Sequence, residues 1–223
     1  IGRIFLKAAV LFVALNLLFA ACRPLESLGN LSLYNNILPG RLRLPYGERP
    51  AEDFNLTLSN LPAMSAAHVW NRPAADDEFR VLLLGDSGIW GWFLPNEHTL
   101  AGQLNEMKLT AADGRRIVVY NLGYPIMSLT KDMVILDEML AGSRPDLILW
   151  PVTLQSFYRP RQLDHPLLYE NPNRVRELIE QYDLGLDLSD SRFVDRSFVQ
   201  ESIIGRRGGL GDLLRLQAWG VAW

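Results

Sequence analysis

The chain has 223 residues, of which 48% are apolar and 21% are charged. These values are close to the average for globular domains and argue against a mainly disordered or multi-span membrane chain. Twenty-two basic and 25 acidic residues give a formal charge of −3, which argues against nucleic acid as a partner. One cysteine precludes an internal disulfide, and the three histidines lack metal-ligand spacing, so we expect no resident metal or cofactor.

Residues 1–22 predict a transmembrane anchor. Residues 4–22 contain only two strongly polar side chains, Lys7 and Asn16, and as a helix they would be about 28 Å long, close to the thickness of a bilayer's hydrocarbon core. Arg3 and Lys7 precede most of the apolar run, so the positive-inside rule places the N-terminus in the cytoplasm. We therefore expect residues 4–22 to contact the lipid bilayer and the body to be periplasmic or extracellular.

The end of this segment leaves two interpretations open. Its sequence, Leu-Phe-Ala-Ala-Cys, is also typical of a lipoprotein cleavage box, with Cys22 as the lipidated residue. The chain retains residues 1–22, which a processed lipoprotein would have lost, and this favours an uncleaved anchor. The first residue is Ile1 rather than Met, so at least the initiator residue is missing.

The regions on either side of the predicted main domain are less regular. Residues 23–78 contain scattered Pro and Gly and predict an extended connector, with one short helix within 58–70 and His68 either packed or solvated. Residues 209–223 become apolar toward their end. They would either begin a second membrane segment or pack as an amphipathic helix, and the charges of Asp212 and Arg215 favour packing.

Residues 79–223 predict an α/β domain. Continuous apolar runs at 79–87, 115–123 and 146–153 are typical of strands buried on both faces of a parallel sheet. Helices are expected between and after them. They are predicted at 95–109, with Leu100, Leu104 and Met107 on one side, at 129–142, with Met133, Leu136, Met139 and Leu140 as the apolar stripe, and at 173–186. This alternation predicts a three-layer α/β/α sandwich with a parallel sheet.

Chemistry in an open parallel sheet is expected at the carboxyl ends of the strands. The first predicted strand ends in Gly85-Asp86-Ser87, the second in Asn121-Leu122-Gly123 and the third in Pro151-Val152-Thr153. A serine directly after a buried strand is well placed as a nucleophile whose neighbouring amides stabilise an oxyanion. In the alternative interpretation, Asp86 and Ser87 only cap the following turn.

These residues resemble a known family. The run from Gly85 to Gly91, Gly-Asp-Ser-Gly-Ile-Trp-Gly, resembles the GDSxxxG first block of the GDSL, or SGNH, hydrolase superfamily, and Asn121-Leu122-Gly123 resembles its glycine block. The resemblance covers about residues 79–155. It implies an SGNH-hydrolase-like fold in which Ser87 is the nucleophile, Gly123 donates an oxyanion amide and Asp86 orders the turn.

The sequence also departs from that family. The third block, which carries an oxyanion asparagine, falls on Pro151-Val152-Thr153-Leu154, so Thr153 or nearby Gln155 would replace that donor. The family's Asp-x-x-His block is absent from these residues, and without its histidine a serine hydroxyl is a poor nucleophile. The histidine strand would then lie beyond Trp223, or the scaffold has lost its chemistry. His165 would either approach Ser87 or, as we favour, be solvated before Pro166.

Two functions follow from these observations. Ser87 would act in a membrane-anchored esterase or acyl-transfer enzyme. Alternatively, the chain would be a non-catalytic accessory subunit whose partners are other subunits of a membrane complex, such as an electron-transport assembly. The aromatic cluster of Trp90, Trp92 and Phe93 would line an acyl or glycan pocket or form a docking patch, although core packing is expected for at least two of the three, and also for Trp150.

Overall fold

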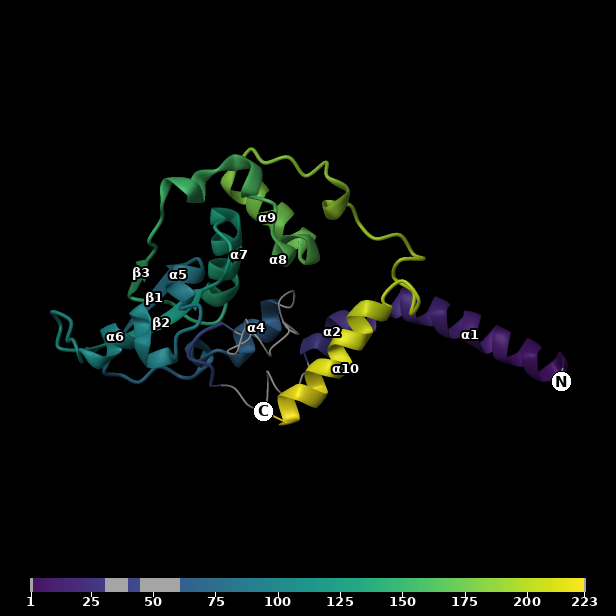
Figure 1. The fold of residues 1–223 in the computed structure, drawn as a ribbon, viewed down its shortest axis with the longest axis horizontal. Coiled ribbons are helices and arrows are strands. Elements are labelled where there is room, and N and C mark those ends of the chain that lie inside the picture. The colour runs from purple at the N-terminus through teal and green to yellow at the C-terminus, as the bar shows by residue number, and fades with distance from the viewer. Residues whose placement is uncertain (1, 31–39, 45–60, 223) are drawn as a thin grey trace.

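The computed structural model describes residues 2–30, 40–44 and 61–222. Its centre is a parallel sheet of β1 (Glu78–Gly85), β2 (Arg116–Gly123) and β3 (Leu147–Leu149) in the order β2-β1-β3 (Figure 1). The strand ends are in register, since Gly85 pairs with Gly123 and Leu83 pairs with Leu149. The predicted α/β class and parallel sheet are therefore confirmed.

Helices precede, connect and follow these strands. They are α1 (Gly2–Cys22), α2 (Pro24–Asn30), α4 (Leu61–Ala67), α5 (Ser87–Trp90), α6 (Leu100–Glu106), α7 (Leu129–Leu140), α8 (Pro166–Glu170), α9 (Pro172–Tyr182) and α10 (Arg207–Ala222). Short 3-10 helices are η1 (Val69–Asn71), η2 (Asn96–His98), η3 (Leu154–Phe157), η4 (Arg159–Arg161) and η5 (Ser191–Phe193).

The central strand β1 is covered on both faces, as its continuous apolar sequence predicts. Because successive side chains of a strand point to opposite faces, Leu82 and Leu84 face one way and Val81 and Leu83 the other. The first pair packs in a large core with residues of α4, α7, α8 and α9. The second pair packs in a smaller cluster with Ala101 of α6. Helices therefore lie on both faces of the sheet.

The third strand differs from its prediction. The sequence of β3 indicates a strand buried on both faces, but Leu147, Ile148 and Leu149 are 44%, 38% and 37% exposed. The reason is its position, because β3 is an edge strand that pairs only with β1 within the described residues. The prediction of burial was wrong for this strand.

Two helices match their predicted faces only in part. Leu104 of α6 packs against the smaller cluster as predicted and Ala101 is buried there, but Leu100 and Met107, the residue after α6, are exposed. In α7, Met139 is buried as predicted, but the buried face also includes Lys131 and Asp132. The polar residues of α7 are buried because its N-terminal turn lies against the carboxyl ends of the strands, where they find polar partners.

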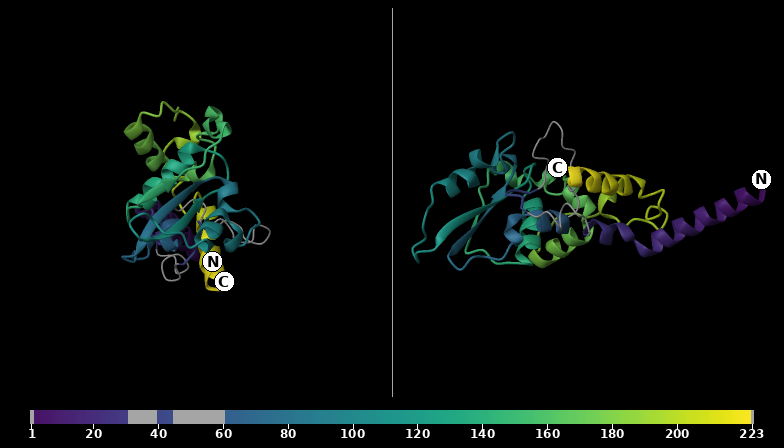
Figure 2. Two further views of the ribbon diagram at one scale, coloured as in Figure 1. Left: turned by 90° about the vertical axis from the view of Figure 1, so that its left-hand side faces the viewer. Right: turned by 90° about the horizontal axis from the view of Figure 1, so that it is seen from below.

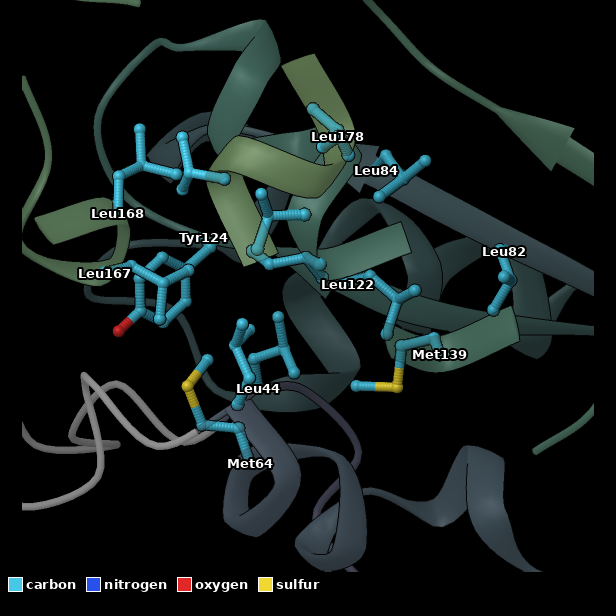
Figure 3. Packing of buried hydrophobic residues seen from close by; sticks show 14 of the residues in the cluster. Leu44, Met64, Leu82, Leu84, Leu122, Tyr124, Met139, Leu167, Leu168 and Leu178 are labelled. Atoms are coloured by element: carbon cyan, nitrogen blue, oxygen red, sulfur yellow. The ribbon is translucent and has the colours of Figure 1, made fainter. Parts of the chain in front are cut away.

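Part of the predicted connector enters the main core. The short helix expected within residues 58–70 is confirmed as α4. Leu44, Leu61, Met64 and Trp70 are each no more than 2% exposed, and Figure 3 shows Leu44 and Met64 among side chains from the sheet and α7. The described part of residues 23–78 is therefore not an extended connector on the surface; residues 31–39 and 45–60 lie outside the described residues.

Helix α1 projects away from the rest of the molecule, as both Figure 1 and Figure 2 show. It is 21 residues long, its most apolar stretch of 18 residues has a mean hydropathy of 2.3, and most of its side chains are exposed. Among the described helices it is the one long and apolar enough to cross a membrane. At the other end of the chain, α10 packs beside α2 (Figure 1), which agrees with the favoured interpretation of the C-terminal residues.

Candidate functional site

The candidate site lies where the chain leaves the carboxyl ends of β1 and β3. From β1 the chain crosses one face of the sheet to β2, and from β2 it returns through α7 to β3 on the other side of β1. After β1 the chain passes through α6, which packs in the smaller cluster on one face, whereas after β3 it continues to α8 and α9, which pack in the main core on the other face. In open parallel sheets such a switch point leaves a crevice in which ligands bind. Ser87 follows β1 and Thr153 follows β3 at this place.

Ser87 is held by a sharp turn between β1 and α5. Gly85 has a φ of +147°, and a Cβ there would lie 2.5 Å from Ile89 Cγ1, so this turn needs glycine. The Asp86 carboxylate caps α5 by accepting a hydrogen bond from Gly88 N–H at 2.8 Å. Ser87 is the first residue of α5 and is partly exposed, and its N–H has no acceptor inside that helix. The capping role of Asp86 is thus present, and the Ser87 hydroxyl makes no hydrogen bond with another described residue.

Gly123 lies directly beneath α5. A Cβ on Gly123 would be 2.2 Å from Trp90 N, so only glycine allows β2 and α5 to approach this closely. The Gly123 N–H donates to Asn121 Oδ1 at 2.9 Å. Asn121 Nδ2 in turn donates to Ile89 O at 3.0 Å. Asn121 therefore holds α5 against the end of β2. It also accepts a hydrogen bond from the Gly123 N–H, the group that the family resemblance expects to bind an oxyanion.

The end of β3 carries a polar turn. Thr153 is exposed, and its N–H donates to Ser156 Oγ at 3.1 Å while Thr153 O accepts from Ser156 N–H at 3.0 Å. This reciprocal pairing caps η3. Gln155, the alternative donor, is also exposed. Among the described residues no hydrogen bond joins Thr153 or Gln155 to Ser87, so the structure places them at neighbouring strand ends without linking them.

A buried ion pair supports the site from below. Lys131 Nζ lies 2.6 Å from Asp132 Oδ1, and both side chains are almost inaccessible. Lys131 also donates to Gly85 O at 3.1 Å and to Tyr124 O, so it ties together the ends of β1 and β2. Burial lowers the pKa of Lys131 and raises that of Asp132, and the mutual attraction opposes both effects. The Asp86 carboxylate also raises the pKa of Lys131.

Lys131 serves as a structural cation. Its ammonium group donates hydrogen bonds to Gly85 O and Tyr124 O, and Asp132 Oδ1 lies close enough to be its ionic partner. A neutral amine would leave Asp132 buried without a counter-ion. Sequence reasoning missed this pair because a Lys-Asp dipeptide at the start of a helix is usually a solvated cap.

His165 is a structural histidine. Its Nδ1 accepts from Leu167 N–H at 3.0 Å, which requires the proton on Nε2, and Nε2 donates to Pro125 O at 3.1 Å. The ring is 2% exposed and lies 5.6 Å from the ring of Tyr124. Burial, followed by the charge of Lys131, lowers the pKa of His165 to about 4. The expectation of a solvated His165 was wrong, and neither nitrogen is available to take a proton from Ser87.

His68 is used in the same way. Its Nδ1 accepts from Trp70 N–H at 3.0 Å, and its Nε2 donates to Asn121 O at 3.0 Å. Burial lowers its pKa to about 4. The packed alternative for His68 is therefore confirmed. His98, the remaining histidine, is exposed on η2.

The aromatic residues after Ser87 divide between core and surface. Trp90 is fully buried, with Arg43 4.1 Å from its ring and its Nε1–H donating to Leu44 O at 3.1 Å. Trp92 is half-buried, and Phe93 is 74% exposed with a φ of +62°. The rings of Trp92 and Phe93 meet edge to face at 5.5 Å. Core packing was expected for at least two of these three residues, but only Trp90 is fully buried. Trp92 and Phe93 form an apolar surface next to α5.

Trp150 supports the charged pair at the end of β3. It is half-buried against the main core, and its Nε1–H donates to Asp132 Oδ2 at 3.0 Å.

No described group of three His, Cys, Asp or Glu side chains is arranged to hold a metal ion. A pocket of about 150 Å³ does occur, between α6 and the outer edge of β2, with Asn105 and Tyr120 in its wall. It lies away from Ser87, and its small size reflects Asn105, whose amide hydrogen-bonds both Val119 N–H and Val119 O at the free edge of β2. We therefore regard the carboxyl ends of β1 and β3, which Ser87 and Thr153 follow, as the candidate site.

Comparisons of this chain with protein-family models, with curated proteins and with solved structures gave no match.

Proposed function

We propose that the chain is a membrane-anchored protein with an SGNH-hydrolase-like domain, in which Ser87 acts as the nucleophile of an esterase or acyl-transfer reaction. The observation that carries the proposal is the place of Ser87. It follows the central strand, at the switch point of the sheet, on a turn that leaves its side chain partly exposed. Helices on both faces of the sheet support the three-layer sandwich that this fold requires.

The proposed reaction begins with attack of Ser87 Oγ on an acyl carbonyl. An Oγ–carbon bond forms and the ester carbon–oxygen bond breaks, while the hydroxyl proton of Ser87 passes through solvent water to the departing oxygen, which leaves as the alcohol. Water or a second alcohol then takes the acyl group and returns a proton to Ser87 Oγ. The Ser87 N–H is positioned to donate to the oxyanion. Gly123 N–H would join it only after Asn121 Oδ1 gives way, and Thr153 is the candidate for a third donor.

The substrate class follows from the surroundings of Ser87. The apolar surface of Trp92 and Phe93 beside α5 suits an acyl chain, while the anchor α1 would keep the site near a membrane. Acyl groups of lipids, cell-wall polymers or polysaccharides fit this description. In this proposal the N-terminus is cytoplasmic and the body lies on the far side of the membrane.

A fluorophosphonate probe tests this proposal on the purified full-length protein in detergent. The probe loses fluoride as Ser87 Oγ bonds to phosphorus, so peptide mapping identifies the labelled residue. We expect labelling of Ser87, none in Ser87→Ala, and unchanged labelling in Ser191→Ala, an exposed serine on η5 away from the crevice. Absence of labelling in the folded wild-type protein would refute catalysis by Ser87.

A specific observation favours a second candidate, a non-catalytic accessory subunit. Both buried histidines use their two nitrogens for backbone groups, and the Gly123 amide is already bonded to Asn121. The exposed apolar β3 edge would then be available to another subunit of a membrane complex. This candidate requires a stable assembly. A lone monomer after mild detergent extraction from its native membrane would exclude it.

A further inference from the structure

Asn16 makes an unusual contact for a residue in an apolar helix. Its Nδ2 donates to Phe12 O at 2.9 Å, one turn earlier, and its Oδ1 accepts from Ile204 N–H at 3.2 Å. Asn16 and Ala20 are 9% and 3% exposed, although most of α1 is open. The two residues are four apart and share one helix face. The segment around Ile204 is thus hydrogen-bonded to α1 at this face, and Figure 1 shows it beside the end of α1 just before α10.

The segment at residues 197–206, here called the membrane-side turn, pairs several of its own polar groups. Ser202 Oγ donates to Val199 O at 2.7 Å and accepts from Gly205 N–H at 3.2 Å. Ser197 N–H donates to Gln200 Oε1 at 2.7 Å. Because unpaired backbone groups are costly in lipid, this internal pairing is what a segment entering a bilayer needs.

The charges of the membrane-side turn are also paired, and its apolar side chains point outward. Glu201 is 9% exposed and lies 3.6 Å from the Arg206 guanidinium. In contrast, Phe198, Val199 and Ile204 are 53%, 76% and 52% exposed. These three large side chains therefore form an exposed apolar surface on this turn.

The position of Asn16 along α1 sets the depth of this turn. Six residues separate Asn16 from Cys22, so Asn16 lies about 9 Å from the end of the helix nearest the body. If α1 crosses a bilayer, a segment bonded to Asn16 enters the boundary between headgroups and acyl chains. Asn16 is a polar residue that such a helix would turn toward a protein partner rather than toward lipid.

We infer that the membrane-side turn is a second membrane contact, which inserts Phe198, Val199 and Ile204 into the body-side leaflet and is fixed to α1 by the bond between Asn16 and Ile204. The occupant of this apolar surface is the bilayer itself, because the turn is hydrogen-bonded to Asn16 of α1, the helix that the proposed function places across the membrane. Together with α1 it would hold the body at a fixed distance from the membrane. The inference rests on the membrane anchor of the proposed function and is independent of Ser87.

Depth-dependent fluorescence quenching tests this inference in the full-length protein. In a Cys22→Ser background, Val199→Cys is labelled with the environment-sensitive dye NBD and the protein is reconstituted into phosphatidylcholine vesicles. We expect lipids brominated near the headgroup end of their acyl chains to reduce its emission to about half. Leu11→Cys, within α1, reports whether the anchor is embedded, and Leu154→Cys, which is 92% exposed near the β3 edge, is the water-exposed control.

The possible outcomes distinguish insertion of the membrane-side turn from insertion of the anchor α1. Quenching at Leu11 and Val199 but not at Leu154 supports the inference, and loss of quenching at Val199 in Asn16→Leu supports the role of Asn16. Quenching at Leu11 alone overturns the inference while leaving the anchor in place, as expected if the turn instead faces water or another protein. Absence of quenching at both positions overturns the anchor and the inference together. None of these readouts depends on activity of Ser87.

Discussion

Lys131 illustrates how one residue positions several others. Its side chain crosses from α7 to the carboxyl ends of β1 and β2, where it meets Gly85 O and Tyr124 O, two residues before Ser87 and one after Gly123. A buried cation is costly by itself, but here two backbone carbonyls accept its hydrogen bonds and Asp132 supplies the opposite charge. The turn that presents Ser87 therefore depends on a charge that lies beneath it.

We predict that Lys131→Met destabilises the protein by about 3–5 kcal/mol, because it leaves Asp132 buried without a counter-ion. The matched control is Lys108→Met, at an exposed lysine, with an expected change below about 0.5 kcal/mol. Urea denaturation of the full-length protein in detergent, followed by circular dichroism, measures both.

A double variant keeps this prediction testable if Lys131→Met does not fold. Lys131→Met combined with Asp132→Leu removes both charges, so it should cost less than the sum of the two single changes. Equal stability of wild type and Lys131→Met would show that the ion pair does not hold the strand ends.

The sequence predicted part of this site at the level of residues. Gly-Asp-Ser after an apolar run indicated a turn and a cap, and both are present at Gly85 and Asp86. It did not predict that Asn121 would engage the Gly123 amide. That bond depends on how closely α5 approaches β2, which is a property of tertiary packing and leaves no local signature.

At the scale of elements, two short helices are each capped at their N-terminus by a histidine side chain. His68 precedes η1 and His165 precedes α8, and in each case Nδ1 accepts from the N–H two residues later. Both rings must be neutral to accept this bond, and burial keeps them so, with a pKa of about 4 for each. The two caps therefore couple the packing of these helices to pH.

We predict that stability falls as the pH drops from 6.5 toward 4. Each histidine has a pKa of about 6.5 when unfolded and about 4 when folded, so in this window the unfolded state binds more protons. The free energy of unfolding therefore decreases with falling pH, by at most about 3 kcal/mol per histidine. Urea denaturation at several pH values measures this slope.

Substituting each histidine separates its contribution to the pH dependence of stability from the contributions of other titrating groups. His68→Asn and His165→Asn keep a cap acceptor but do not titrate, so each should reduce the slope by up to about 1.4 kcal/mol per pH unit. His98→Asn, at an exposed histidine, is the control and should leave the slope nearly unchanged. A slope that is the same in all variants would contradict the coupling.

Periodicity predicted the existence of the elements better than their buried faces. The apolar runs located all three described strands, yet β3 is exposed because an edge position depends on strand order, which the local pattern does not encode. In α7 the buried Lys131 and Asp132 lie outside any apolar stripe. Their burial follows from polar partners on other elements, which a helical pattern does not reveal.

At the scale of the whole molecule, the region before the sheet is part of the folded body. Leu44, Met64 and Trp70 lie in the same core as Leu122 and Met139, and Trp70 Nε1–H donates to Met139 O at 2.9 Å. Arg43 also hydrogen-bonds Trp90 O and Gly91 O, after the turn that carries Ser87. A division of the chain at residue 78 would therefore cut through both the core and the support of the candidate site.

We predict that Met64→Ala destabilises the sheet as strongly as a substitution within it. Met64 is 1% exposed in the main core, so the lost contacts and the cavity should cost about 2–5 kcal/mol. Met107→Ala, at a methionine that is 63% exposed after α6, should change stability by less than about 0.5 kcal/mol. Because the region around α4 and the sheet share one core, the loss of far-ultraviolet and tryptophan signals should shift together in Met64→Ala. A separate early transition, with the sheet unaffected, would instead show that the region before residue 78 unfolds as an independent connector.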